Sequence, residues 1–489
     1  MLHVLAAFFF AYLFLYAAFT GLIGHYTDDY STLNFLLSVN ILFCWAGIVY
    51  LWQKKVNSLV DPFIFFMAAA LVFNAGHCIL NVLFLLPSVN RLLNDEFPQS
   101  IIFVTQIIVL LSLACWGMGG LLAAAYSAKA KQEDAQQLDY IRLALRRVGW
   151  SIIAVSIAPA FYITMRMVTT ASQMGYGGIF DPEFLLDVQR GLVFNLARFF
   201  PLGVLCVIAG SRKYRQQAYF AVSLMMMQSG LLFYAGTRSL AAFPLLMAAW
   251  VWDRTIARIP RAYFLTIGIF MFLVVFPLVS LVRGTEGVSR MKSDFYVNAF
   301  KNIDNPLVSI LDESGASMKI AAWVYMLTPE TKDYLYGESY VYALFSIFPN
   351  LFWDIHPSAK FQSRHIENWL TGEVDAEKLE TGGGYGFSFI GESYLNFGWL
   401  GVTLFMILQG WLFARFILWG MKSNNPARIV AIAVFSITFV FYARSDIGGM
   451  PRVLLWFSVI PYLVISSLAR RYRRQELLIL DATAKTASK

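Results

Sequence analysis

Residues 231–246 read LLFYAGTRSLAAFPLL and place an arginine at the reversal between two apolar segments. Gly236 suits a tight turn because glycine adopts backbone angles that other residues avoid. Thr237 and Arg238 follow at the start of the next segment, where backbone N–H groups and the helix dipole favour an anion. Ser or Asn would turn the chain without a permanent charge. Arg238 therefore indicates that this turn binds an anion.

The composition around this stretch is typical of a membrane protein. Hydrophobic residues make up 58% of the 489 residues and charged residues 14%, with a mean hydropathy of +0.60. Soluble domains carry roughly 25% charged residues. From this composition we expect an all-α polytopic membrane protein. We expect no cofactor and no metal site, because the cysteines lie inside apolar runs with no spacing for a disulfide or a metal ion. They are Cys44, Cys78, Cys115 and Cys206.

Twelve runs of the sequence are predicted to span the membrane. Crossing a hydrocarbon layer of ~30 Å takes about 20 apolar residues in a helix. The runs lie at 2–23, 32–52, 62–87, 101–125, 148–168, 191–209, 217–235, 239–252, 262–282, 397–420, 429–443 and 453–469.

The distribution of Lys and Arg gives the orientation, because positively charged loops stay in the cytoplasm. Alternate loops and the C-terminal tail contain 21 Lys and Arg residues, against five in the short loops of the other side. Both termini are therefore expected in the cytoplasm. Topology also accounts for the net charge of +8, so the basic composition does not indicate nucleic-acid binding.

A long insertion at 283–386 separates the ninth predicted span from the tenth. It holds 14 Asp and Glu against 9 Lys and Arg, and it includes VSILDESGASMKIAAWVYML and SYVYALFSIFPNLFW, which are apolar on one face. We expect these segments to lie along the membrane interface or to cover the bundle as a lid. A solvated spacer is the alternative. The chain thus divides into 1–282, 283–386, 387–469 and a basic cytoplasmic tail, 470–489.

Several arginines collect on the outer side, and those in short outer loops run against the usual charge bias. An arginine within a span costs roughly 2.5 to 3.5 kcal/mol on insertion scales, so a compensating partner is expected. A bound polyanion would serve, since the planar guanidinium group suits bidentate contact with phosphate oxygens. The alternative is snorkelling to lipid headgroups, which is harder for Arg198, well inside its apolar run. The set is Arg166, Arg198, Arg238, Arg283 and Arg444.

The C-terminal half contains an ordered series of motifs: AGTRSLAAF (235–243), SLVRGTE (280–286), FPNLFWDIHPS (348–358), FSFIGESYLNFGWLGV (387–402) and ARSDIGGMPRVLLW (443–456). In this order they resemble segments of the Wzy-type repeat-unit polysaccharide polymerases of bacterial envelopes, which include the O-antigen and enterobacterial common antigen polymerases. The resemblance covers roughly residues 230–460. The N-terminal half agrees in hydropathy.

This resemblance implies a GT-C-like enzyme of the bacterial inner membrane. Such polymerases take the growing glycan from undecaprenyl diphosphate at the periplasmic face and transfer it to a hydroxyl of the next lipid-linked repeat unit, releasing undecaprenyl diphosphate. The departing diphosphate needs charge stabilisation, which preorganised arginines supply without a metal. Membrane lipids and a chain-length regulator are further expected partners.

The resemblance also assigns roles to the outer-side residues. Arg238 and Arg283 would contact the donor diphosphate, with Gly236 and Thr237 forming the turn beside them. Further phosphate contacts are expected at Arg198, Arg444 and Arg452.

The general base, which accepts the proton of the acceptor hydroxyl, is open among several groups. Glu392 is favoured because it lies where the insertion rejoins the membrane. Asp446 is expected to pair with Arg444 or Arg452 instead. The remaining candidates are Glu286 and His356 as bases, with Tyr385, Trp353 and Trp399 as sugar-stacking rings or interface anchors.

Three other functions stay open. An O-antigen ligase shares this architecture but joins one complete chain to lipid A core. A metal-dependent polyprenyl-phosphate-sugar glycosyltransferase would use an acidic pair such as Asp28 and Asp29 in the first outer loop. A flippase for the same lipid-linked oligosaccharide would show an internal repeat, whereas the insertion divides the spans unequally, nine to three.

Overall fold

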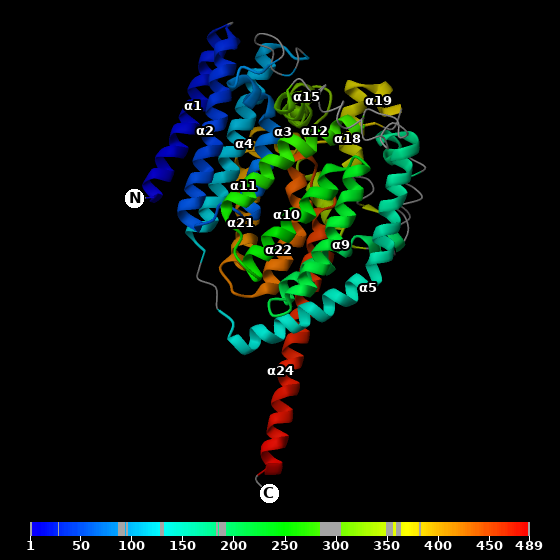
Figure 1. The fold of residues 1–489 in the computed structure, drawn as a ribbon. Coiled ribbons are helices and arrows are strands. Elements are labelled where there is room, and N and C mark those ends of the chain that lie inside the picture. Colours follow the sequence, from blue (N-terminus) through cyan, green and yellow to red (C-terminus); the bar gives the residue numbers. More distant parts are fainter. Residues whose placement is uncertain are drawn as a thin grey trace.

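The computed structural model describes residues 2–27, 29–86, 93, 96–127, 132–181, 184, 192–283, 305–348, 356–357, 363–380 and 383–487. Within these residues every regular element is a helix (Figure 1). Ten helical stretches of the described chain are long and apolar enough to cross a membrane. The prediction of an all-α polytopic membrane protein is confirmed.

The first helices follow the predicted spans, and the fifth does not. The first four are α1 (Leu2–Tyr26), α2 (Tyr30–Val56), α3 (Pro62–Val82) and α4 (Gln99–Ala125). The fifth, α5 (Ala135–Met174), has 40 residues with Pro159 inside it, far more than the predicted 148–168. It crosses one end of the bundle and then runs along its side (Figure 1). Its polar first part lies outside the predicted span, because hydropathy detects only the apolar part of a helix.

The run predicted at 191–209 is divided into α7 (Leu192–Ala197) and α8 (Phe200–Gly210). Arg198 lies at the break. Pro201, in the first turn of α8, suits a helix start because it lacks the N–H that a continuous helix would need there. The break thus places Arg198 at a helix junction.

The reversal at Arg238 joins α9 (Arg215–Tyr234) to α10 (Arg238–Thr255). Both helices form where spans 217–235 and 239–252 were predicted, but neither is among the ten stretches that meet the span criteria. For α10 the reason is its charge, since Arg238, Asp253 and Arg254 all fall within its 18 residues. The next predicted span is built from α11 (Arg261–Phe270), η3 (Met271–Val275) and α12 (Phe276–Arg283).

The insertion contributes short helices that pack against the bundle. Of these, α14 packs on α3, and α15 packs on α3, α4 and α20. In Figure 1, α15, α18 and α19 lie at one end of the bundle, and both chain termini point away from that end. The helices are α14 (Pro306–Gly315), α15 (Ser317–Leu327), α16 (Glu338–Phe345), α18 (Ser363–Val374) and α19 (Ala376–Glu380).

The C-terminal helices differ from the prediction at their ends. The span expected at 397–420 begins earlier, with α20 (Phe389–Leu400), so Glu392 lies inside a helix; a kink follows at Gly398, where φ is 56°. The tail expected from 470 continues α24 (Ile460–Ala487) as helix. Between these lie η5 (Gly401–Phe405), α21 (Met406–Met421), α22 (Pro426–Phe439), η6 (Val440–Arg444), α23 (Met450–Val453) and η7 (Leu454–Val459).

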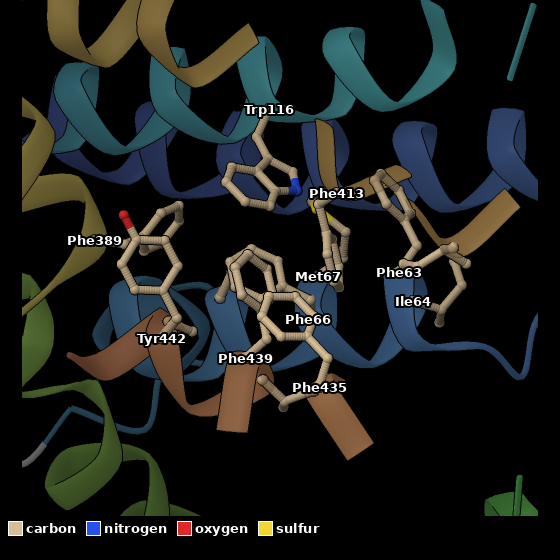
Figure 2. Close-up of a cluster of buried hydrophobic side chains, with 14 of the residues drawn as sticks. Phe63, Ile64, Phe66, Met67, Trp116, Phe389, Phe413, Phe435, Phe439 and Tyr442 are labelled. Atoms are coloured by element: carbon tan, nitrogen blue, oxygen red, sulfur yellow. The ribbon is translucent and has the colours of Figure 1, made fainter. Parts of the chain in front are cut away.

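An aromatic cluster forms the centre of the bundle (Figure 2). Phe66 of α3 stacks on Trp116 of α4, with ring centroids 4.4 Å apart. Phe413 of α21 stacks on Phe439 of α22 at 4.1 Å. Tyr442 of η6 lies at the edge of this cluster, so the core reaches directly to the segment that carries Arg444.

The helices α4 and α21 approach each other through glycines. A Cβ atom at Gly119 would lie 2.0 Å from the Ile407 carbonyl oxygen, and one at Gly410 would lie 2.2 Å from that of Trp116. Small residues allow this backbone contact, which provides dispersion contacts in a membrane where the hydrophobic effect between helices is weak.

Candidate functional site

The turn before Arg238 is a helix C-cap that uses its own polar groups. Gly236 has φ of 90°, and the N–H groups of Gly236 and Thr237 donate to the carbonyl oxygens of Phe233 and Leu232, which is the Schellman pattern. The Thr237 hydroxyl also donates to Leu232 O, at 2.9 Å. In this structure Thr237 therefore stabilises the turn.

Arg238 is the first residue of α10 and is 9% exposed. Its Nη2 atom lies 2.7 Å from Oε2 of Glu313, on α14 of the insertion. The Ser280 hydroxyl of α12 donates to the same oxygen at 2.6 Å. The guanidinium group and this hydroxyl thus converge on one anionic oxygen, at a place where three helices meet.

Contacts between α3 and α14 fix the position of Glu313. A Cβ atom at Gly76 would lie 2.7 Å from Leu311 O and 2.9 Å from the Cα of Gly315, so the two backbones touch. Asp312, the residue before Glu313, also contacts α3: its Oδ1 atom lies 3.5 Å from Nε2 of the buried His77. Glu313 is not among the residues predicted from the sequence, where its signal is an adjacent acid pair in a helix with one apolar face.

Glu392 is fully buried. Its Oε1 accepts a hydrogen bond from the Ser339 hydroxyl at 2.7 Å. Its Oε2 accepts from the Ile447 N–H at 2.9 Å and from the Tyr442 hydroxyl at 3.4 Å. The carboxylate connects α20 to α16 and to the loop at 445–449, and it has no exposed face for a substrate in this structure.

Asp446 lies in the same loop and is 4% exposed. Its Oδ1 accepts from the Gly448 N–H at 3.0 Å, whereas Oδ2 is buried without a hydrogen-bond partner among the described residues. Burial, together with the charge of Glu367, raises the pKa of Asp446 to about 7. The expected pairing with Arg444 or Arg452 is not found among the described ion pairs, so that expectation is corrected.

Arg444 ends η6 beside the segment where the insertion rejoins the membrane. A Cβ atom at Gly386 would lie 3.9 Å from Arg444 Nε, and the guanidinium group lies over the Phe73 ring, 5.8 Å from its centroid. The Gly386 N–H donates to Glu367 at 2.9 Å. Arg444 and Glu367 therefore both lie next to the same short segment.

Asn74 is a second residue that the sequence analysis missed. Its Nδ2 donates to Ala443 O at 2.8 Å, and its Oδ1 accepts from the Ser388 hydroxyl at 2.6 Å. It thereby joins α3 to the residue before Arg444 and to Ser388, the N-cap residue of α20. A buried amide inside an apolar span was the available signal.

Arg198 and Arg452 lie on segments that pack together. Arg198 lies over the Phe457 ring at 5.2 Å, and Phe457 follows Arg452 by five positions in the chain. Arg452 Nε donates to Ser346 O at 2.8 Å. These two arginines form a group on α23, η7 and the α7–α8 junction, distinct from the contact of Arg238 with Glu313.

Of the other predicted residues, Tyr385 and His356 lie in the insertion, and four lie wholly or with their side chains outside the described residues. The Tyr385 hydroxyl donates to Asp375 at 2.8 Å, and Lys378 Nζ lies 3.4 Å from the ring centroid. Burial raises the pKa of Tyr385 to about 12. His356 Nε2 lies 3.0 Å from Phe348 O. The Arg283 side chain, Glu286, Trp353 and Asp28 fall outside the described residues.

Within the described residues, no group of three or more His, Cys, Asp and Glu is placed to hold a metal ion. Asp29, one of the two adjacent acids of the first outer loop, accepts from the Thr32 hydroxyl at 3.2 Å.

Comparison with known proteins gives one match. The sequence model of the family described as O-antigen polysaccharide polymerase Wzy matches residues 2–476. No curated protein and no solved structure matches the chain.

Proposed function

Because this chain belongs to the O-antigen polysaccharide polymerase Wzy family, we propose that it polymerises repeat units carried on undecaprenyl diphosphate at the periplasmic face of the bacterial inner membrane. Polymerisation of polysaccharide repeat units by a multi-pass membrane glycosyltransferase is the activity of the family. To this activity the proposal adds four details: the undecaprenyl diphosphate carrier, the periplasmic face, the release of undecaprenyl diphosphate and metal independence.

The proposed reaction exchanges one bond to the anomeric carbon for another. The hydroxyl oxygen of the incoming repeat unit forms a bond to the anomeric carbon of the growing glycan. The bond from that carbon to the diphosphate oxygen breaks, and its electron pair leaves with undecaprenyl diphosphate. The hydroxyl proton passes to a base. Negative charge therefore develops on the diphosphate, where a fixed cation stabilises the transition state.

The observation that carries this proposal is the contact of Arg238 with Glu313. A largely buried guanidinium group at an outer turn already binds an anionic oxygen at 2.7 Å. A phosphate oxygen has the charge and hydrogen-bonding capacity to replace that carboxylate oxygen, and Ser280 would donate to it as it does to Glu313. We assign the donor diphosphate to Arg238, with Arg283 at the end of α12 as its second cation.

We assign the proton to Asp446 in place of Glu392. Both oxygens of Glu392 accept hydrogen bonds within the fold, whereas Asp446 Oδ2 has no such partner in the part of the chain that the structure describes. A carboxyl group with its pKa raised to about 7 is matched to proton transfer near neutral pH. Glu392 then positions the loop that carries Asp446. Arg444 precedes Asp446 by two residues and would contact phosphate beside that carboxyl group.

The proposed orientation of the chain in the membrane places the insertion on the periplasmic side. Placing the insertion in the periplasm puts Arg238 and Arg444 there, and puts both chain termini in the cytoplasm, in agreement with the distribution of Lys and Arg. Membrane lipids surround the helices, and a chain-length regulator is a further proposed partner.

The test uses purified full-length protein and a synthetic lipid-diphosphate repeat unit. We expect a ladder of chain lengths that persists in EDTA, is abolished by Arg238→Ala and is strongly reduced by Arg238→Lys, because lysine lacks the bidentate geometry. Arg212→Gln, a change at an exposed arginine of the α8–α9 loop, serves as the matched control. Full activity of Arg238→Ala would contradict the diphosphate role.

Other products would identify the alternative functions. A single transfer to lipid A core without a ladder indicates a ligase, and loss of activity in EDTA indicates a metal-dependent glycosyltransferase. If the protein is a flippase, its deletion leaves the repeat unit on the cytoplasmic side.

A further inference from the structure

A groove opens on the side of the bundle between α5, the α7–α8 junction and α24. Its volume is about 550 Å³, within the usual range of about 300 to 1,000 Å³ for small-molecule sites. Val155 is 58% exposed on a helix that is long and apolar enough to span the membrane, so the groove is open to lipid. The apolar part of the lining consists of Val148, Ile152, Val155, Leu196, Phe199 and Leu468.

Polar groups gather at one end of this groove, where Arg147, Ser151 and Tyr472 line it. The Arg147 guanidinium group lies over the Tyr472 ring, 5.0 Å from its centroid. The Ser151 hydroxyl donates to Arg147 O at 3.0 Å, which leaves its oxygen free to accept. Ser156, farther along the groove, donates to Ile152 O at 2.7 Å, so it offers no unused donor to an apolar chain. The groove therefore has a cationic, polar end and an apolar remainder, which is the division of a phospholipid.

Arg147 differs from other cations at this end of the bundle because no carboxylate of the described residues pairs with it. Arg142 Nη1 lies 3.3 Å from Asp139 Oδ1, and Arg473 Nη2 lies 3.4 Å from Asp134 Oδ2. Arg147 is exposed, so a ligand can reach its N–H groups. A guanidinium group carries five donors in a planar arrangement, and this arrangement suits two-point contact with phosphate oxygens.

The polar end of the groove lies away from the insertion. In Figure 1 the first part of α5 crosses the end of the bundle from which α24 projects, whereas α15, α18 and α19 lie at the opposite end. The proposed orientation places the end with Arg147 at the cytoplasmic leaflet. That leaflet carries anionic lipids, and basic pockets between spanning helices on that side bind their headgroups.

We propose that the groove binds an anionic phospholipid of the cytoplasmic leaflet, with its phosphate on Arg147 and an acyl chain along the apolar wall. The chain gains dispersion contacts with residues such as Val155 and Leu468. The cation supplies the preference for a headgroup of net negative charge, because the ammonium group of a zwitterionic headgroup offsets its phosphate. In phosphatidylglycerol, the headgroup hydroxyls would donate to Ser151.

This site goes beyond the proposed function, because the lipid in it is not a substrate. The groove lies between α5 and α24, which also meet through the hydrogen bond of Tyr140 to Glu476. A lipid held there would fill the space between these two helices and stabilise their packing.

The experiment compares dioleoyl phosphatidylglycerol with dioleoyl phosphatidylcholine, which have the same acyl chains. Binding of each lipid to purified full-length protein is counted by native mass spectrometry. The wild type is expected to bind phosphatidylglycerol about tenfold more tightly, through a charge-assisted hydrogen bond. Arg147→Gln should bring the ratio of the two affinities close to one. Arg147→Lys should keep part of the preference, because the charge stays while the two-point contact is lost.

Matched controls exist for the cation and for the wall of the groove. Val155→Trp should weaken both lipids and keep the preference, whereas Val4→Trp, at a valine of α1 that is 57% exposed, should match the wild type. Arg212→Gln should also match it. Arg212 lies at the same end as Arg147, since a Cβ atom at Gly210 would lie 2.7 Å from the Arg146 backbone nitrogen.

Four results would overturn the inference. Equal affinity of the wild type for the two lipids would leave a non-specific annular lipid only. A wild-type preference in Arg147→Gln, or an equal loss of preference in Arg212→Gln, would assign the effect to the general positive charge of this end. Indistinguishable binding by Val155→Trp and Val4→Trp would place the lipid outside the groove. Displacement of phosphatidylglycerol by an equal amount of undecaprenyl phosphate would assign the groove to a polyprenyl lipid.

The ladder assay separates this inference from the proposed function. Arg147→Gln is expected to form ladders like the wild type at saturating substrate, because Arg147 lies at the end of the bundle opposite the insertion. A wild-type protein that forms no ladder but binds phosphatidylglycerol through Arg147 would remove the polymerase function and leave the lipid site.

Discussion

Arg238 and Glu313 form an ion pair between α10 and α14, with Nη2 and Oε2 2.7 Å apart. The two residues are 75 positions apart in the chain. The pair joins the turn between α9 and α10 to the first described helix of the insertion. A substrate diphosphate that reaches Arg238 must therefore displace a carboxylate or share the cation with it.

Glu313→Gln is expected to lower the KM for the lipid-linked donor about threefold to tenfold. The diphosphate would no longer compete with a carboxylate whose pairing, at a partly exposed site, contributes on the order of 1 kcal/mol. The measurement is the donor dependence of the initial rate of ladder formation. Glu313→Asp, which keeps the charge, is the comparison variant. A higher KM in Glu313→Gln would show instead that Glu313 orients Arg238 for the substrate.

Asp446 is expected to make stability depend on pH. Its pKa is raised in the folded protein from 3.8 to about 7, so between these values the folded state binds a proton that the unfolded state releases. The free energy of unfolding should therefore fall as pH rises from about 4 to about 7, and level off above that.

The measurement for Asp446 is the thermal unfolding midpoint in detergent across this pH range. Asp446→Asn should flatten the profile, because the amide does not titrate. The negative charges of Glu367 and of the neighbouring Glu392 disfavour ionisation of Asp446. Glu367→Gln removes one of these charges, so it should reduce the slope of the unfolding midpoint against pH without removing it. An identical slope in Asp446→Asn and wild type would assign the titration to another group.

Gly410→Ala is expected to destabilise the bundle by roughly 1 to 3 kcal/mol, the cost of overpacking a tight contact. The added Cβ would lie 2.2 Å from the Trp116 carbonyl oxygen, which belongs to the backbone and has little freedom to move. Gly230→Ala in α9 is the matched control, because nothing lies within 4 Å of its added Cβ. There, alanine should be neutral or slightly stabilising. Equal unfolding midpoints for the two variants would contradict close packing of α4 on α21.

Local sequence signals predicted most of the spans. Apolar runs identified α1 to α4 within a few residues, because crossing a bilayer needs about 20 apolar residues in one helix. The same reasoning failed at α5, whose polar first part is helical, and at α20, which begins with Phe389 ahead of the apolar run. It also missed the break at Arg198, since hydropathy averages over a window and does not detect where backbone hydrogen bonding stops.

The sequence by itself determined the class of the molecule and the positions of its arginines relative to the apolar runs, because those depend on composition and on order along the chain. Only the tertiary structure decided which groups meet. Glu313 reaches Arg238, and Asn74 joins Ala443 to Ser388 across more than 300 positions. It also decided that Glu392 is enclosed, while one oxygen of Asp446 receives no hydrogen bond from the described residues. Such pairings depend on how helices pack in three dimensions, and a one-dimensional pattern of hydropathy and charge does not specify them.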